Sequence, residues 1–227
     1  MIGSPGASAR HDSVLTAVDT EIASGTLAAG AVITLDDIGV QYRVSRSLAR
    51  EVIRVLESMG MVASRRRIGL TIQPSSAWNV FDPRLIRWRL ESSERAAQLR
   101  SLAELRRGFE PASAGLAAAR ADTAQCRALA AAVSDLQMAV RSRDEAAYRQ
   151  ADKEFHRIVV SSSGNPMFRA LGELMTDIPS CGLGAQIAEL HDTVARAIRQ
   201  ADASSAEDAM RAIVDVALGN VSLAGEG

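Results

Sequence analysis

Apolar residues recur at spacings of three and four along residues 44–61. They are Leu48, Val52, Val55, Leu56 and Met59. This spacing predicts an amphipathic helix with one buried stripe. Ser45 has the short hydroxyl side chain that caps a helix N-terminus, and Gly60 is the residue type that usually ends one. The pattern therefore predicts a helix over this segment.

A second stripe on the same helix is basic. Arg46, Arg50 and Arg54 follow one another at intervals of four, which places them on one exposed side. A row of this kind is often only the solvated face of a surface helix. A helix that keeps its first side chains and three arginines clear of the core can also enter the major groove of DNA. The flanking segments favour the second interpretation.

The preceding segment predicts a short helix and a turn. Thr34 and Asp37 have the spacing of a capping box, and Leu35, Ile38 and Val40 are expected to form a small buried face. The polar turn at 41–43 then leads to the helix that begins after the cap. The two helices and their turn make a helix-turn-helix.

The following segment, 62–74, predicts two short strands around a tip that contains arginines and glycine, closed by Pro74. A basic hairpin directly after a recognition helix is a wing, which contacts phosphates or the adjacent minor groove. Seven arginines and two acids lie between Arg43 and Arg67, whereas the net charge of the whole chain is -1. This local charge marks a DNA footprint. The predicted DNA contacts are Ser45, Arg46, Ser47, Arg50, Arg54, Arg65, Arg66, Arg67 and Gly69.

The segment 13–74 resembles the winged helix-turn-helix of the GntR family of bacterial transcription regulators. The matching pieces, in order, are 23–27 with Gly30, 44–46, 50–51, 56–57, 60–62 and the tip 65–69. One departure is Ser47-Leu48-Ala49, where many members have Thr-Pro-Val. The resemblance implies a double-stranded DNA operator as partner. Because one winged domain makes few contacts, we expect a homodimer on a palindromic operator.

The rest of the chain predicts a mainly α protein. We expect a disordered tail at 1–11, the winged domain at 12–74, a linker at 75–82 and an all-helical domain at 83–227. The expected helices after the linker are 83–92, 97–120 with a break at Pro111, 123–142, 145–162, 166–177, 185–201 and 205–221. No long apolar run and no signal-peptide layout appear, which predicts a soluble cytoplasmic protein without a membrane partner.

The helical part resembles the FCD ligand-binding domain of the FadR-like GntR subgroup. The pieces that carry the likeness are 104–106, 109–111, 116–120, Asp152 with 155–156, 163–166, and His191 with 197–198. Residues 78–83 with Trp88 also resemble the linker of members that respond to sugar acids. The resemblance implies a bundle that binds an effector and dimerises.

Three polar residues fall inside apolar stripes of this part. Asp152 and His156 lie on the inner face of helix 145–162, and His191 lies on that of helix 185–201. A carboxylate and two imidazoles suit zinc, nickel or manganese. The alternative is an internal Asp152–His156 hydrogen bond with His191 satisfied in the core. The resemblance implies that these positions are metal ligands.

One expected ligand is missing. The family adds a histidine on the last helix after an Ala-Met pair, and here Ile213 takes that place after Ala209-Met210. Hydrocarbon offers no lone pair, so we expect metal binding that is weak or dependent on an effector.

Arg106 lies on an inner stripe with Leu99, Leu102 and Phe109. A buried arginine needs an anion. The partner is either an effector carboxylate or a salt bridge to Glu110 or Asp152. By the resemblance, Asn165 is a second effector contact.

Two functions of different classes fit this sequence. One is a DNA-binding transcription regulator, a repressor that responds to a small carboxylate such as a sugar acid. The other is a metal-dependent enzyme in the helical bundle. Because no nucleophile–base set and no HExxH motif appear, the regulator is favoured.

Overall fold

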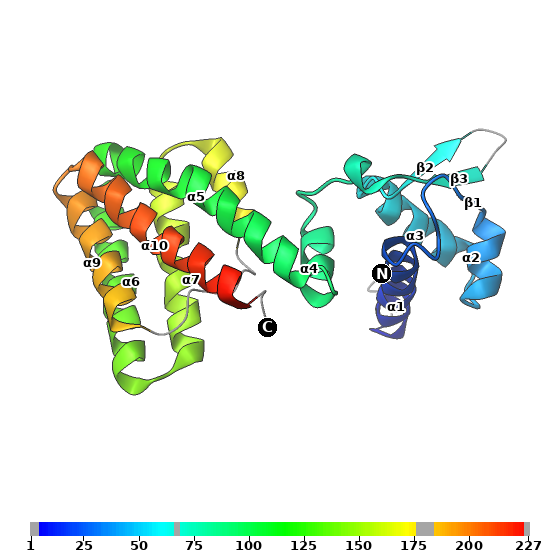
Figure 1. Cartoon of the computed structure of the whole chain (residues 1–227), viewed down its shortest axis with the longest axis horizontal. Helices are drawn as coiled ribbons and strands as arrows, with labels where there is room; N and C mark the ends of the chain where they lie inside the picture. The colour runs from blue at the N-terminus through cyan, green and yellow to red at the C-terminus, as the bar shows by residue number, and fades with distance from the viewer. Residues whose placement is uncertain (1–4, 66–68, 176–183, 225–227) are drawn as a thin grey trace. The chain divides into compact units, whose positions relative to one another are not determined.

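The computed structural model of the protein describes residues 5–65, 69–175 and 184–224. The chain divides into two compact units, Met1–Trp88 and Arg89–Gly227 (Figure 1). In chain order the elements are α1 (Pro5–Ala23), β1 (Val32–Ile33), α2 (Leu35–Gln41), α3 (Arg46–Ser58), β2 (Val62–Arg65), β3 (Gly69–Ile72), the 3-10 turn η1 (Ser75–Ala77), α4 (Pro83–Glu91), α5 (Arg95–Arg120), α6 (Thr123–Ser142), α7 (Glu145–Ser162), α8 (Pro166–Leu174), α9 (Ala185–Arg199) and α10 (Ala203–Ala224).

The helix-turn-helix of the first unit forms as predicted. Thr34 and Asp37 make a reciprocal capping box at the start of α2, and the Ser45 hydroxyl accepts a hydrogen bond from the Leu48 N–H at the start of α3. The expected burial is wrong at one position of α2. Val40 is 80% exposed near the end of this two-turn helix, in which only Ile38 is buried.

The wing belongs to a three-stranded antiparallel sheet with strand order β1-β3-β2. Ile33 of β1 lies opposite Leu70, and Val62 of β2 lies opposite Ile72. The sequence predicted β2 and β3 but not β1, whose two residues are too short to show an alternating pattern. β1, which pairs with β3, thus connects the base of the wing to the start of the helix-turn-helix.

The segment expected to link the domains packs into the first unit. Trp78 is buried in the same core as Leu56 and Ile72, and its ring lies 6.3 Å from that of Trp88. Gly60 makes this packing possible: its φ is +73°, and a Cβ there would lie 2.6 Å from the Ala77 carbonyl oxygen. Phe81 remains half exposed.

The first helix includes residues that we expected to be disordered. α1 begins at Pro5, so residues 5–11, which we expected to belong to a disordered tail, are helical. Its Val14, Val18 and Ile22 pack into the core of the first unit. Small residues and alanine in this stretch are compatible with helix, and the absence of apolar periodicity hid it.

The second unit is a bundle of helices. The long α5 and α10 lie side by side, α9 packs against α10 and α6, and α7 packs against α5 and α6 (Figure 1). α5 continues unbroken through Pro111, although we expected a break there. Because Pro111 is fully accommodated in the buried face, packing against the neighbouring helices outweighs the lost backbone hydrogen bond.

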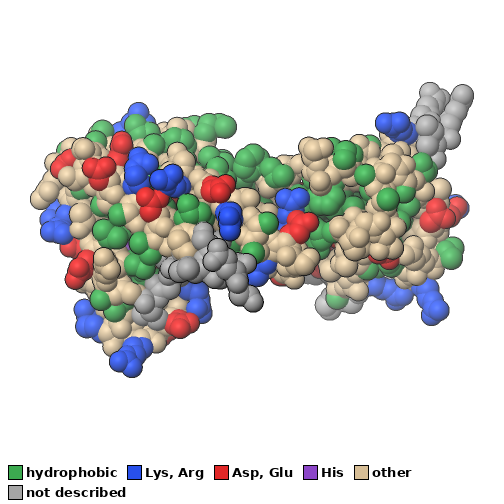
Figure 2. All heavy atoms as spheres, in the orientation of Figure 1, with side chains coloured by type: hydrophobic (Ala, Val, Ile, Leu, Met, Phe, Trp, Pro, Cys, Tyr) green, Lys and Arg blue, Asp and Glu red, His purple; other side chains and the backbone are tan. Residues whose placement is uncertain are grey.

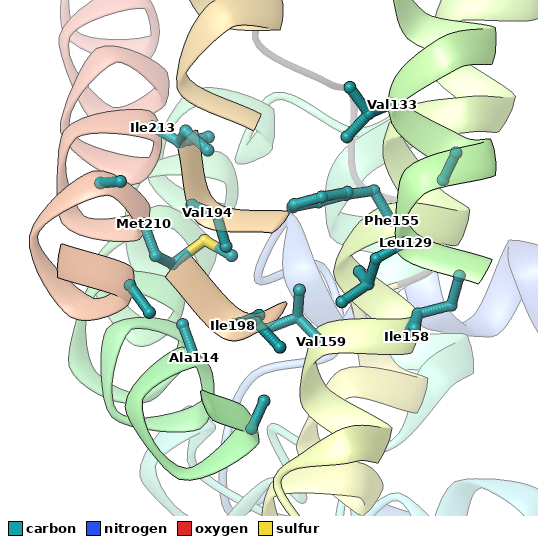
Figure 3. Packing of buried hydrophobic residues seen from close by; sticks show 14 of the residues in the cluster. Ala114, Leu129, Val133, Phe155, Ile158, Val159, Val194, Ile198, Met210 and Ile213 are labelled. Carbon is teal, nitrogen blue, oxygen red and sulfur yellow. The ribbon is translucent and has the colours of Figure 1, made fainter. Parts of the chain in front are cut away.

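The bundle core is mostly aliphatic and also contains Phe155 and Tyr148. Val133 and Leu129 come from α6, Val159 and Phe155 from α7, and the side chains of α9 and α10 close the other side (Figure 3). Ile213 points from α10 toward Val194 of α9 in the same cluster (Figure 3). In the described residues, no helix is sufficiently long and apolar to span a bilayer.

A buried carboxyl group lies in the first unit. Asp19 of α1 is 4% exposed, and burial raises its pKa to about 7, against the opposing charge of Arg84. Arg84 itself donates to both oxygens of Asp82, at 3.0 and 2.7 Å, and to the Ser58 hydroxyl at 2.9 Å. The guanidinium is therefore engaged by Asp82, and Asp19 is left without full compensation.

This arrangement predicts a pH-dependent stability of the first unit. The pKa of Asp19 is higher in the folded chain than in the unfolded one, so the neutral carboxyl stabilises the fold at low pH. That stabilisation is lost as pH rises from about 4 to about 7. Asp19→Asn should abolish this loss of stability. The variant should therefore gain free energy of unfolding relative to the wild type at pH 8, and this gain should exceed the one at pH 5 by about 2 kcal/mol.

Urea unfolding followed by tryptophan fluorescence measures this directly, because both tryptophans of the chain, Trp78 and Trp88, lie in the first unit. Asp12→Asn, an exposed acid on the same helix, is the control. Equal stabilisation by Asp19→Asn at both pH values would contradict the raised pKa.

Candidate functional site

The outer face of α3 carries the predicted basic stripe. Arg46, Arg50 and Arg54 are exposed. The opposite face is buried in the core of the first unit through Ala49, Val52, Ile53 and Leu56. Of these four, Ala49 and Ile53 were not in the predicted stripe. The helix is thus anchored on one side and free on the other, as a recognition helix requires.

Side chains at the start of α3 make hydrogen bonds to neighbouring residues. Ser45 and Ser47 share a hydrogen bond of 2.9 Å between their hydroxyls. Arg46 donates from Nε and Nη2 to the two carboxylate oxygens of Asp36 on α2, at 2.9 and 2.8 Å. The side chain expected to reach DNA bases is therefore already paired within the protein.

A groove of about 430 Å³ lies between α3 and the wing. Arg50 and Arg54 line one side, and Arg65 and Gly69 line the other. Gly69 is required by the fold, since its φ is +118° and a Cβ would lie 3.0 Å from the Ile33 carbonyl oxygen. Two further predicted contacts, Arg66 and Arg67, lie outside the described residues.

The charge of this region is local. On the face of the second unit displayed in Figure 2, acidic and basic side chains are intermixed. Glu57, one of the two acids between Arg43 and Arg67, is turned to the wing, where its carboxylate accepts from the Ser64 N–H at 3.2 Å and from the Ser64 hydroxyl. Glu57 therefore does not pair with the arginines of α3, and of the three arginines on the exposed stripe only Arg46 has an acidic partner among the described residues.

The second candidate site is the polar cluster in the bundle. α7 brings in Asp152 and His156, one turn apart, and α9 brings in His191. All three are buried, with exposed fractions of 3%, 8% and 0%. Asp152 Oδ1 lies 3.2 Å from His191 Nε2 and 3.8 Å from His156 Nε2. The structure therefore joins the three residues that the sequence singled out.

The Nδ1 atom of each imidazole, which is the nitrogen farther from the cluster, lies near an acceptor oxygen. His191 Nδ1 lies 2.7 Å from the Ile187 carbonyl oxygen, and His156 Nδ1 lies 2.9 Å from Glu110 Oε2. Because the Ile187 carbonyl can only accept, the His191 contact favours a proton on Nδ1, which leaves a lone pair on Nε2 of the neutral ring. The contact of His156 Nδ1 with Glu110 is close but not aligned as a hydrogen bond, and a proton on that Nδ1 would give His156 the same tautomer. The two lone pairs and Asp152 Oδ1 then converge on one point.

Convergent lone pairs need a positive centre between them. Asp152 Oδ1 and both Nε2 atoms are buried, and within the described residues none makes a well-directed hydrogen bond. The three ligand atoms lie within 4.8 Å of one another. Tetrahedral zinc ligands lie about 3.3 Å apart, so the residues fit a divalent ion with small adjustments. A proton on one Nε2 is the alternative that satisfies the same atoms.

Glu110 is the functional residue that the sequence reading underrated. Its carboxylate is 2% exposed and contacts His156, as the outer partner of a metal-ligating histidine does. It also accepts from Arg106 Nε at 2.7 Å and from Nη2 at 3.2 Å. Among the open alternatives for Arg106, the structure therefore shows the salt bridge to Glu110. The i,i+4 spacing of these two residues was the available signal.

The electrostatics of the cluster favour ionised acids. Burial acts to raise the pKa of Glu110, but Arg106 and His156 outweigh it and lower that pKa to about 2. Burial also acts to raise the pKa of Asp152, and contacts with His191, His156 and Arg106 together lower it. Both carboxylates are therefore charged at neutral pH.

A cavity of about 30 Å³ adjoins the cluster. Its described lining comprises Arg106, Glu110, Asp152, Lys153, His156, Arg157, Val160, Gly172 and Met175. This volume holds about two water molecules. Lys153 and Arg157 were not predicted, although they follow Asp152 and His156 by one position on the same helix. The space suits an ion with its waters, and a larger ligand requires the cavity to widen.

Two residues of the sequence reading lie apart from this lining. Asn165 caps α8, where its side-chain oxygen accepts from the Met167 N–H at 2.9 Å. Ile213 is fully buried in the aliphatic core. Neither offers a ligand atom to the cluster as it stands.

A winged helix-turn-helix joined to a helical bundle with a buried polar cluster defines a DNA-binding transcription regulator with a ligand-binding domain. Two family models match the chain: "Bacterial regulatory proteins, gntR family" over residues 11–72 and the FCD domain over residues 101–216. The protein belongs to the GntR family and carries an FCD effector-binding domain. The resemblance seen in the sequence is thereby confirmed.

Known relatives agree with this family. The galactonate operon transcriptional repressor of Escherichia coli strain K12 is 24% identical over 211 residues, which cover 88% of this chain and 91% of the relative. A solved GntR structure from Streptococcus agalactiae is 23% identical with a TM-score of 0.51, covering 92% of this chain and 98% of that one. The structure of Lar, which controls the expression of the Listeria monocytogenes agr system, is 14% identical with a TM-score of 0.61, covering 98% and 99%.

Proposed function

We propose that the protein is a homodimeric repressor that binds a palindromic operator through α3 and the wing. The observation that carries the proposal is the exposed basic face of α3, anchored on its other side in the core of the first unit. Two copies related by a two-fold axis would present two such faces to successive major grooves. The relatives named above are transcription regulators, which disfavours the metal-dependent enzyme as an alternative.

We further propose that a small hydroxy-carboxylate controls DNA binding from the buried cluster. Asp152, His156 and His191 would hold a divalent ion, which supplies a Lewis-acid centre for carboxylate and hydroxyl oxygens. Glu110 holds the ring of His156, and Arg106 lines the same cavity. The relative named for a galactonate operon supports a sugar acid as the effector class. Because the cavity is small, effector binding requires it to widen.

Replacing base-reading arginines should reduce sequence discrimination. Arg46→Ala and Arg50→Ala are each expected to cost about 1–3 kcal/mol of discrimination. Arg65→Ala, together with changes at Arg66 and Arg67, should instead flatten the salt dependence of binding, because phosphate contacts release counterions. Gel shifts on a duplex selected from a randomised pool measure both. Arg141→Ala on α6 is the control, and wild-type affinity of both α3 variants would contradict the assignment.

The proposed operator geometry also predicts a dimer. Light scattering at micromolar concentration should give twice the 24.1 kDa of one chain. The complex with the selected duplex should contain two chains per DNA. A monomer in both samples would rule out the two-fold arrangement.

Metal and effector affinities should be coupled. With three protein ligands and Ile213 in place of a fourth, zinc or nickel should bind weakly to the free protein and more tightly with galactonate present. Galactonate affinity should rise by the same factor when the metal is added. Calorimetry with each component in turn tests this.

The test variant is His191→Ala, and the matched control is His11→Ala. His11 lies in α1 and is the histidine of the chain that does not belong to the cluster. His191→Ala should weaken metal binding at least about 100-fold, more than typical changes to outer partners, and His11→Ala should not change it. Tight binding that survives His191→Ala would place the site elsewhere. No heat under any condition would favour an imidazole–carboxylate pair without metal.

A further inference from the structure

The arginine at the first position of α3 is held by an acid from the other helix of the motif. Arg46 donates from Nε and Nη2 to the two oxygens of Asp36, at 2.9 and 2.8 Å. The pair is exposed, with 77% of the arginine side chain and 62% of the aspartate side chain accessible. It therefore lies at the surface that faces DNA if α3 is the recognition helix.

The same helix offers a comparison. Arg50 and Arg54 are exposed on the same stripe, and in the described part of the chain neither has an ion pair or hydrogen bond. Their guanidinium groups can follow the position of a phosphate. Arg46 instead has its guanidinium plane set by a two-point contact, the geometry in which an exposed ion pair does restrict a side chain.

The contact leaves a definite edge of Arg46 available. A guanidinium has five N–H donors in a planar fork, and Asp36 takes those on the Nε–Nη2 side. Three N–H groups remain, and two of them, one on Nη1 and the second on Nη2, lie parallel along the distal edge. Two parallel donors match O6 and N7 of guanine in the major groove, which is the commonest specific contact of arginine.

The geometry points to Asp36 as a specificity-determining residue of the DNA interface, which positions Arg46 to read one guanine in each operator half-site. This rests on the proposal that α3 reads base edges. The Asp36 carboxylate is also expected to increase specificity in a second way. It repels phosphates, so it weakens binding to DNA that lacks the guanine and widens the gap between specific and non-specific affinity.

The alternative is that Asp36 only complements the N-terminus of α2, where an acid is favoured by the helix dipole. That role explains the residue type but not the two-point contact with Arg46. It predicts that removing the charge changes stability and leaves base preference unaltered. The two accounts therefore separate in a binding experiment.

The test compares base preferences by selection from a randomised duplex pool, followed by measured affinities for duplexes with single substitutions. Asp36→Asn keeps the shape but offers one acceptor in place of two. It should reduce the preference for guanine at one position about three- to tenfold and raise affinity for unrelated DNA about two- to fivefold. Asp36→Glu should restore part of the preference.

Two controls make the outcome specific. Glu51→Gln removes an exposed negative charge from α3 without touching Arg46, and should raise affinity for all duplexes without altering preference. In an Arg46→Ala background, Asp36→Asn should no longer affect preference, because the two residues act as a unit.

The experiment distinguishes failure of the inference about Asp36 from failure of the proposal that α3 reads base edges. If Arg46→Ala changes the preference and Asp36→Asn does not, the inference about Asp36 is wrong and base reading by α3 stands. If neither changes it while binding persists, base reading at this end of α3 is wrong, and Asp36 has no role in it. A uniform rise in affinity with Asp36→Asn, equal to that with Glu51→Gln, would also overturn the inference.

Discussion

The helical unit depends on one constraint: a carboxylate stays ionised in a hydrocarbon interior only when charges and hydrogen bonds surround it. Glu110 and Asp152 meet this condition through Arg106, His156 and His191, and the pKa of each acid is lowered despite burial. These residues come from α5, α7 and α9. Removing any one of these three partners would leave a buried carboxylate less well compensated in the apolar core, so the contacts favour one register of the three helices.

The DNA-facing helix of the first unit has the opposite arrangement, with its charges in water. α3 places aliphatic side chains in the core and leaves its arginines in water, and the three-stranded sheet holds the wing beside it. Trp78 and Gly60 tie the following segment into that core. The backbone of the recognition helix is thus anchored in the core, while the ends of its arginines differ. Arg46 is paired with Asp36, and Arg50 is exposed on the same stripe without a partner among the described residues.

Periodicity explains which features the sequence could predict. The stripes of α3, α7 and α9 are long, so these helices and the inward direction of Asp152, His156 and His191 could be expected before the structure. That the three residues share one site was implied by the family resemblance. β1 and the helical start of α1 could not, because two residues show no period and Pro5–Ala9 has no apolar face. Pro111 was misread because local propensity yields to packing. The contacts of Asp36 with Arg46 and of Glu110 with His156 join different helices, and spacing along the chain does not supply such distances.

Charge balance links the ion and the effector in the cluster. With both imidazoles neutral, Glu110 and Asp152 contribute two negative charges and Arg106 one positive charge, which leaves the group with a net charge of -1. A divalent ion held by Asp152 and the two histidines would reverse that sign. In a buried site, an excess positive charge is as costly as a negative one, and the carboxylate of an effector would neutralise it. Because Ile213 adds neither charge nor lone pair, the effector is the group best suited to complete both the coordination and the charge.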